Sequence, residues 1–264
     1  MQSSHAGSDK QGRHEEAQYI LSAGRASAKP YMVHLQSEFS IANYIRIADE
    51  VAARSRDIPG QNPSTKPRVL DWGAGIGQVS YLLSRRNCAV SSFDIGDPGI
   101  SPLEIDPSLT IQRDNHPSRL PYDRGAFDVV LSCGVLEHVP DEEASLDEIH
   151  RVLRPGGSFL IYNLPQRFGY TEFIVRAFHL GYTHERRYSE AGTRSLLGRH
   201  GFAVRGLRRS NMLPHNFRGL PAPVREALTS RTARLLRADL ALSSVPLLNR
   251  ISGMLELDVE RLGQ

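Results

Sequence analysis

The segment from Asp71 to Gln78 carries three glycines at alternate positions, Gly73, Gly75 and Gly77, directly after an acidic residue. Glycine has no Cβ, so a ligand can approach the main chain closely there and the chain can adopt the positive φ angles of a tight turn. If a helix begins where this segment ends, its first N–H groups are also available to polar ligand atoms. The segment therefore predicts a ligand-binding turn between a strand and a helix.

The charge of this turn distinguishes between two classes of cofactor. Dinucleotide-binding proteins use the pattern G-x-G-x-x-G with a pyrophosphate at the helix N-terminus, whereas here Gln78 stands where the third glycine of that pattern would fall. The carboxylate of Asp71 would repel a pyrophosphate but suits a cationic amino group. S-adenosylmethionine carries such a group and no phosphate, so the turn favours it over a nicotinamide dinucleotide.

A second acidic residue, Asp94, follows the segment 90–93. It lies about 20 residues beyond the glycines, which is the separation that a strand–helix–strand unit produces. A carboxylate at the tip of the second strand can accept hydrogen bonds from both hydroxyls of a ribose. Asp94 does not separate the two cofactors, but it favours an adenosine-containing ligand over a bare phosphate.

The elements that must position these residues alternate as in an α/β sheet. Strands are predicted over residues 68–71, 89–94, 109–112, 127–133, 158–163, 202–207 and 254–260. Helices are predicted over residues 38–54, 77–86, 141–153 and 189–201, and the segment 223–248 is predicted to be mainly helical. The segment 127–133 is apolar along nearly its whole length, as expected for a strand buried in a parallel sheet.

We therefore expect an α/β fold with a Rossmann-like, seven-stranded, mostly parallel sheet sandwiched by helices. Its last strand, 254–260, is expected to run antiparallel beside 202–207. The polar residues 1–16 are predicted to be a mobile tail, and residues 17–264 a single domain. Within this domain we expect an N-terminal helical lid (17–64), the core (65–215), and a helical insertion with the last strand (216–264).

Four successive motifs resemble those of the class I S-adenosylmethionine-dependent methyltransferases, in particular the enzymes that act on small molecules. They are Val-Leu-Asp-Trp-Gly-Ala-Gly-Ile-Gly at 69–77, Phe-Asp-Ile at 93–95, the run 120–132, and Val-Leu-Glu-His-Val at 135–139 with Leu-Arg-Pro-Gly-Gly at 153–157. Each motif alone is unspecific, but their order and spacing together are specific. The resemblance covers roughly residues 67–164.

The resemblance also implies roles for individual residues. The methionine part of the cofactor should lie against the glycine turn, the ribose against Asp94 and the adenine against Ile95, with Asp114 or Asn115 near the adenine amino group. The end of the strand 127–133 should lie under the cofactor and face the acceptor. The predicted cofactor-binding set is Asp71, Gly73, Ala74, Gly75, Gly77, Gln78, Asp94, Ile95, Asp114, Asn115, Ser132, Cys133 and Val135.

Methyl transfer from a sulfonium is an in-line substitution on an activated donor, so the protein mainly positions the acceptor and excludes water. If the acceptor is a hydroxyl, a general base helps to remove its proton. We predict His138 as that base, with its neighbour Glu137; the alternative is that this pair only shapes the pocket. The predicted acceptor-binding residues, each with a surface or packing role as the alternative, are Tyr31, His34, His184, Arg187 and Tyr188.

Composition narrows the classes of partner and cofactor. The formal net charge is only +3. A nucleic-acid surface would need clustered basic residues with aromatics between them, so no nucleic-acid partner is expected. No apolar run approaches the roughly 18 residues of a membrane span, so we expect a cytoplasmic protein. The two cysteines lack metal-ligand spacing, and the acidic run 141–143 is better explained as a helix cap, so no metal is expected. Peripheral membrane contact through the Leu/Arg-rich segment 225–250 is the less favoured alternative to solvated helices.

The sequence thus predicts that the chain methylates a small-molecule acceptor with S-adenosylmethionine, leaving S-adenosylhomocysteine as the product. Oxygen is favoured over nitrogen or carbon as the accepting atom. Two alternatives remain, a nicotinamide-dependent oxidoreductase and a non-catalytic binding module that keeps the nucleoside-binding fold. The identity of the acceptor and the oligomeric state are not indicated.

Overall fold

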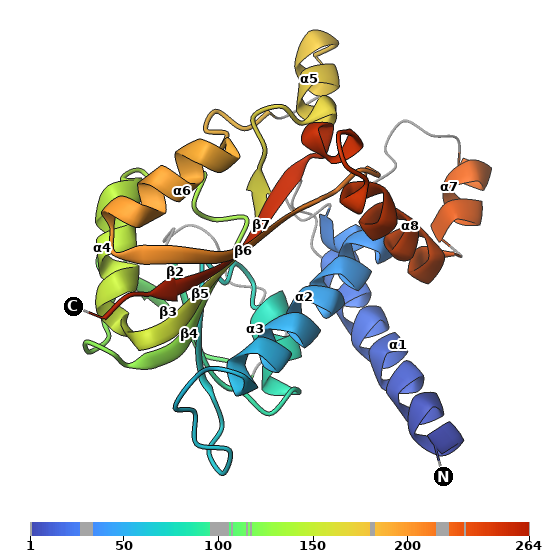
Figure 1. The fold of residues 1–264 in the computed structure, drawn as a ribbon. Helices are drawn as coiled ribbons and strands as arrows, with labels where there is room; N and C mark the ends of the chain where they lie inside the picture. The colour runs from blue at the N-terminus through green and yellow to red at the C-terminus, as the bar shows by residue number, and fades with distance from the viewer. Residues whose placement is uncertain are drawn as a thin grey trace.

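The computed structural model describes residues 2–26, 34–95, 106, 108–114, 116, 118–179, 183–214, 222–229 and 231–263. A seven-stranded sheet with helices on both faces forms its centre (Figure 1). The strands are β1 (Arg68–Trp72), β2 (Ala89–Ile95), β3 (Ile111–Asp114), β4 (Phe127–Cys133), β5 (Leu153–Pro165), β6 (Phe202–Ser210) and β7 (Met254–Arg261). The helices are α1 (Gln2–Ala26), α2 (Glu38–Arg56), α3 (Gln78–Ser84), α4 (Glu142–Val152), α5 (Tyr170–Ala177), α6 (Glu190–Arg199), α7 (Ala222–Thr229) and α8 (Thr232–Ser244), with a 3-10 turn at Leu248–Ile251.

The strand order, β3-β2-β1-β4-β5-β7-β6, confirms the expected fold. The strands β1 to β5 pair in parallel, whereas β7 lies antiparallel between β5 and β6. The order reverses at β1, which pairs with β2 on one side and β4 on the other. In open α/β sheets a ligand binds beyond the carboxyl ends of the strands at such a reversal, which is where the glycine turn after β1 lies.

Two apolar clusters cover the two faces of the sheet. Successive side chains of a strand point to opposite faces, and in β4 this separates Val129, which packs toward α2 and α3, from Val130, which packs toward α4. Both side chains are fully buried. Burial on both faces explains why the sequence of β4 is apolar without alternation.

The N-terminus differs from the prediction, because residues 2–26 form the helix α1 where a tail was expected for residues 1–16. Glu16 is buried and its carboxylate accepts a hydrogen bond from Arg86 at 2.9 Å. One turn further, Ile20 and Leu21 are buried in the core. The partner of Glu16 follows α3, far away in the sequence, so local composition could not indicate that this polar segment is anchored.

The helix α5 was not expected from the sequence. Phe173 on α5 is 72% exposed, and Phe178 directly after the helix is 69% exposed. Glu172 on the same helix is buried. Because apolar residues usually face the core and polar residues the solvent, the spacing of apolar residues in this segment does not predict a helix. In Figure 1, α5 projects beyond the sheet near the ends of β5 and β7.

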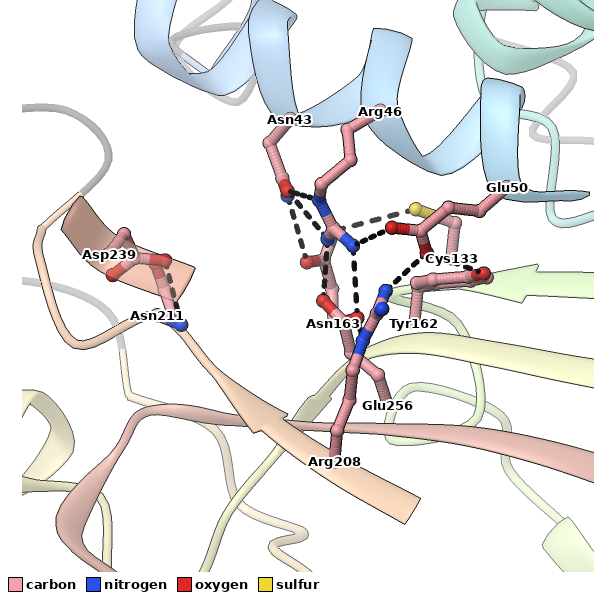
Figure 2. A network of polar contacts seen from close by, with 10 residues as sticks. All are labelled: Asn43, Arg46, Glu50, Cys133, Tyr162, Asn163, Arg208, Asn211, Asp239 and Glu256. Atoms are coloured by element: carbon pink, nitrogen blue, oxygen red, sulfur yellow. Dashed lines mark hydrogen bonds and ion pairs between the residues drawn. The ribbon is translucent and has the colours of Figure 1, made fainter. Parts of the chain in front are cut away.

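The mainly helical C-terminal segment contains α7 and α8. Asp239 of α8 is buried and accepts hydrogen bonds from the N–H groups of Asn211 and Leu213, at 3.2 and 2.6 Å, which attaches α8 to the end of β6 (Figure 2). Among the described residues, no helix has the length and apolar character needed to cross a membrane.

Candidate active site

The glycine turn between β1 and α3 has a main chain that only glycine adopts readily. The φ angles of Gly73, Gly75 and Gly77 are +75°, +61° and +89°, in the left-handed region that is costly for other residues. A Cβ atom on Gly73 would come within 2.4 Å of a methyl group of Val135. Val135 therefore lies directly against the turn, from the segment that follows β4.

Asp94 connects the end of β2 to this turn. One carboxylate oxygen accepts the N–H of Gly75 at 2.6 Å, and the other accepts the N–H of Ile95 at 2.7 Å. Burial raises the pKa of Asp94, and these two hydrogen bonds oppose the rise. Each carboxylate oxygen can accept a further hydrogen bond, and Ile95 beside it is 40% exposed. The arrangement combines acceptors for hydroxyl groups with an apolar surface, as a nucleoside requires.

Asp71 places a buried carboxylate at the start of the turn. It is 2% exposed and accepts a hydrogen bond from the Ser80 hydroxyl at 2.6 Å. The Ser80 oxygen in turn accepts a hydrogen bond from the Ser92 hydroxyl at 2.7 Å. Burial raises the pKa of Asp71 to about 6; the hydrogen bond from Ser80 lowers it, and the negative charge of Asp94 raises it further. A ligand cation at this point would stabilise the ionised form.

Three observations show that the residues around the turn fit a polar ligand. A Cβ atom on Gly75 would meet only the Gln78 Oε1 atom, at 3.7 Å, so there is space above this glycine. The buried atoms Gln78 Oε1 and Ser132 Oγ have no hydrogen-bond partner in the described part of the chain. Tyr44 of α2 lies near Gln78, whose side chain opposes the rise that burial causes in the pKa of Tyr44. Buried polar atoms without partners are costly, and a ligand with an amino and a carboxylate group could satisfy them.

The predicted adenine contacts are partly described. Asp114 ends β3 and pairs in register with Ile95, so the two residues lie side by side at the edge of the site. Its carboxylate accepts the N–H of His116 at 3.1 Å. The other candidate, Asn115, lies outside the described residues.

Cys133, at the end of β4, belongs to a polar network that connects the sheet with α2 (Figure 2). The amide of Asn163 donates to Cys133 Sγ at 3.4 Å, and the amide of Asn43 donates to Asn163 Oδ1 at 3.5 Å. Asn163 has a φ of +55°, which asparagine tolerates better than most residues. The carboxyl ends of β4 and β5 are thereby linked to the helix that was predicted to be a lid.

A set of ion pairs around the buried Glu256 extends this network along α2. The Arg46 guanidinium lies 2.6 Å from Glu256 of β7 and 2.9 Å from Glu50, and Arg208 of β6 contacts both carboxylates (Figure 2). Glu256 is only 3% exposed, and its pKa is lowered because the two arginines outweigh burial. Sequence analysis missed this set, since its members come from three elements, α2, β6 and β7, and follow no motif.

The predicted acceptor side contains a cluster of four ionisable side chains. Glu137 Oε1 lies 3.7 Å from His138 Nε2, and the rings of His138 and His184 are 5.6 Å apart. The Nδ1 atom of His184 lies 2.7 Å from Oε1 of Glu172 on α5. Sequence analysis named three of these residues, and the structure brings them together. It missed Glu172, which depends on the unexpected helix α5.

The protonation of this cluster is set by burial and by neighbouring positive charge. Burial raises the pKa of Glu137 to about 7, although the positive charges of His184 and Arg186 lower it. The pKa of His138 is lowered by burial and by the same two charges. A lowered pKa keeps the His138 imidazole neutral at neutral pH, the state in which it can accept a proton.

The remaining predicted acceptor residues differ in which side chains they contact. The positive charge of Arg187 lowers the pKa of Glu172, which places Arg187 beside it. Tyr188 is buried, and its hydroxyl donates to Glu142 at 2.8 Å, as in the packing alternative. His34 lies with its ring 6.0 Å from that of Tyr44. Tyr31 lies outside the described residues.

Comparisons with known proteins show what part of the chain is similar to. Residues 70–161 match the family described as a methyltransferase domain. A ubiquinone biosynthesis O-methyltransferase from Paramagnetospirillum magneticum is 37% identical over 109 residues, which are 40% of this chain and 43% of that protein. A protein of the same name from Psychrobacter arcticus is 34% identical over 101 residues, 34% of this chain and 38% of that protein. The chain thus matches less than half the length of these relatives.

Solved structures show the same fold at low sequence identity. A [4+2]-cyclase superimposes with a TM-score of 0.54 at 16% identity, covering 83% of this chain and 81% of that one. The fold is therefore shared with a protein named for a different reaction, and the reaction of this chain must be argued from its site.

Proposed function

We propose that the chain is a class I S-adenosylmethionine-dependent methyltransferase that transfers a methyl group to an oxygen atom of a small molecule, since residues 70–161 match a methyltransferase domain and part of the chain resembles an O-methyltransferase. The observation that carries this proposal is the turn of three left-handed glycines between the buried Asp71 and the partly buried Asp94. Two carboxylates next to one turn suit a ligand with an ammonium group and ribose hydroxyls, and disfavour a diphosphate. Oxygen is favoured as the acceptor because the relatives with matching sequence are named O-methyltransferases.

The residues around the turn would hold S-adenosylmethionine. Asp71 would face its ammonium group, Asp94 its ribose hydroxyls, and Ile95 with Asp114 its adenine. Gln78 and Ser132 contribute buried polar atoms that have no hydrogen-bond partner among the residues that the structure describes. When bound, the cofactor supplies a methyl group that is activated by a positively charged sulfur.

The cluster after β4 would act on the acceptor. A hydroxyl placed between the turn and His138 would lose its proton to the neutral imidazole, and Glu137 would stabilise the imidazolium that forms. His184, oriented by its hydrogen bond with Glu172, would help to position the acceptor beside His138. Tight placement of the acceptor is the main contribution of such a site, because the donor is already activated.

Calorimetric titration of the full chain with S-adenosylhomocysteine and with NADH tests this proposal. We expect saturable binding of S-adenosylhomocysteine and none of NADH, and we expect Gly75→Val to abolish the binding. Gly60→Val is a matched control, since Gly60 has a φ of +77° and open space around it but lies in the linker before β1. Binding of NADH alone would support an oxidoreductase.

The rival reading is a binding module without catalysis. Incubating the chain with a labelled methyl donor and a metabolite extract tests it, because only an enzyme transfers the label to an extract component. If S-adenosylhomocysteine binds but no component of any extract becomes labelled, the proposed transfer is wrong and the binding module is favoured.

A further inference from the structure

The side chains of Glu137, His138 and His184 are close enough to share one ion. One ligand atom from each lies within 4.8 Å of the others, and the closest printed pair, Glu137 Oε1 and His138 Nε2, is 3.7 Å apart. Two ligands of a tetrahedral zinc ion, each about 2.1 Å from the metal, are about 3.4 Å apart. Small side-chain rotations would therefore bring all three atoms to one centre.

A second, independent observation concerns the carboxylate of Glu137. Its side chain is only 2% exposed, and its Oε2 atom has no hydrogen-bond partner within the described ranges. A buried carboxylate oxygen without a partner is costly. A cation bound between Glu137 and the two imidazoles would remove this cost.

Glu172 gives the cluster an outer layer of the kind seen at metal sites. A metal-binding histidine usually donates its second ring nitrogen to a carboxylate, which fixes the tautomer and the orientation of the ring. The contact of 2.7 Å between His184 Nδ1 and Glu172 Oε1 has this form. It assigns Nε2 as the coordinating atom of His184.

We propose that Glu137, His138 and His184 bind one divalent transition-metal ion of the zinc class. Two imidazoles and one carboxylate form a donor set that such ions prefer, and three protein ligands leave a coordination position for an exogenous oxygen. This departs from the metal-free expectation of the sequence, which considered the two cysteines and the acidic run 141–143. In the structure Asp141 caps α4 by accepting the N–H of Ala144 at 3.0 Å.

The role of the ion rests on the proposed O-methylation, although its binding does not. Coordination lowers the pKa of a hydroxyl, so the acceptor would lose its proton to water at neutral pH. Its oxygen would form the new bond to the methyl carbon while the bond from sulfur to that carbon breaks, and sulfur would keep the electron pair as a neutral thioether. In this state His138 is a ligand and not the base.

The proposal is tested by titrating the chelator-treated full chain with Co²⁺ and following its visible absorption. We expect one equivalent to bind, and His184→Ala to weaken binding at least about tenfold. Glu172→Gln should weaken it by about tenfold to a hundredfold, because it removes only the outer layer. His200→Ala is the matched control. His200 also contacts a carboxylate, Asp147 at 2.6 Å, but it lies at the C-terminal end of α6. Its removal should leave Co²⁺ binding unchanged.

Two further measurements keep the outcome decisive. Each variant is assayed for S-adenosylhomocysteine binding, and Glu137→Gln, which is nearly isosteric, replaces any variant that fails to fold. Absence of Co²⁺ binding, binding that His184→Ala leaves unchanged, or full methyl transfer by chelator-treated protein overturns the metal site. The last of these results would leave the proposed methyl transfer standing, whereas Co²⁺ binding without S-adenosylhomocysteine binding would overturn the transfer and keep the metal site.

Discussion

His184 Nδ1 and Glu172 Oε1 lie 2.7 Å apart, and this contact joins the loop before α6 to α5 at the edge of the proposed acceptor site. Burial alone would raise the pKa of Glu172, but the hydrogen bond and charge of His184 outweigh it and lower the pKa. A carboxyl group with a lowered pKa in the folded state stabilises the protein above its unfolded pKa, and this contribution is lost as the pH falls through the folded pKa.

Glu172→Gln should therefore lower the melting temperature at pH 7, and the difference from the wild type should shrink as the pH falls below about 4.3, the ordinary pKa of glutamate. Thermal melts between pH 7 and pH 3 measure this difference. A constant difference over the whole range would show that the loss is due to packing and not to the charge of Glu172.

Asp71→Asn should stabilise the protein without ligand and weaken the binding of S-adenosylhomocysteine. A carboxyl group whose pKa is raised favours folding below its unfolded pKa, and this contribution is lost as the pH rises through the folded pKa of about 6. The ionised, buried Asp71 thus costs stability at pH 7, by up to about 3 kcal/mol from the size of the shift. Melting temperature and calorimetry on the same samples check both effects.

Asp128→Asn is the matched control for Asp71→Asn. Asp128 is also buried on a strand of the same sheet, but Arg68 and Arg154 lower its pKa. Its neutralisation should therefore destabilise the protein at pH 7. Equal effects of the two substitutions would contradict the difference in electrostatics.

Glu256→Gln should destabilise the protein by about 3–5 kcal/mol, the usual loss when one partner of a buried ion pair is removed. The substitution removes the buried one of the two carboxylates, Glu256 and Glu50, that Arg46 and Arg208 share. Glu143→Gln breaks an exposed pair with Arg199 and should cost at most about 1 kcal/mol. Denaturant unfolding of both variants checks the prediction, and similar losses would show that the network around Glu256 contributes little.

Gly73→Ala should abolish cofactor binding through two separate effects. The new Cβ would collide with Val135 at 2.4 Å, and a φ of +75° costs about 1–2 kcal/mol for a residue other than glycine. The double variant Gly73→Ala/Val135→Ala should recover part of the lost folding stability, because it removes only the collision. No recovery in a thermal melt would place the whole cost in the backbone.

The sequence predicts the parts of the site that depend on local pattern. The glycine turn, Asp94 and the capping of α4 by Asp141 follow from neighbouring residues, and the sheet that carries them has the expected strand order. The pairing of Arg46 with Glu256 joins residues 210 positions apart, and no local pattern encodes it.

Glu172 shows a second kind of limit. It lies on a short helix whose apolar residues Phe173 and Ile174 are exposed and whose acidic residue is buried, the reverse of the pattern on which periodicity depends. Only the fold, which brings α5 beside His184, gives this residue a partner.

The attachment of α2 to the sheet also matters for redesign of the enzyme. Arg46 and Arg54 form ion pairs with Glu256 and Asp258 of β7. The helix α2, which carries Tyr44, is thus attached to the sheet over much of its length. Repacking α2 to admit a bulkier acceptor would gain little, since it would disturb the ion pairs between α2 and β7. If these residues bind the acceptor as proposed, randomising the outer positions around Arg187 and α5 should alter selectivity while the ion pairs of α2 stay intact.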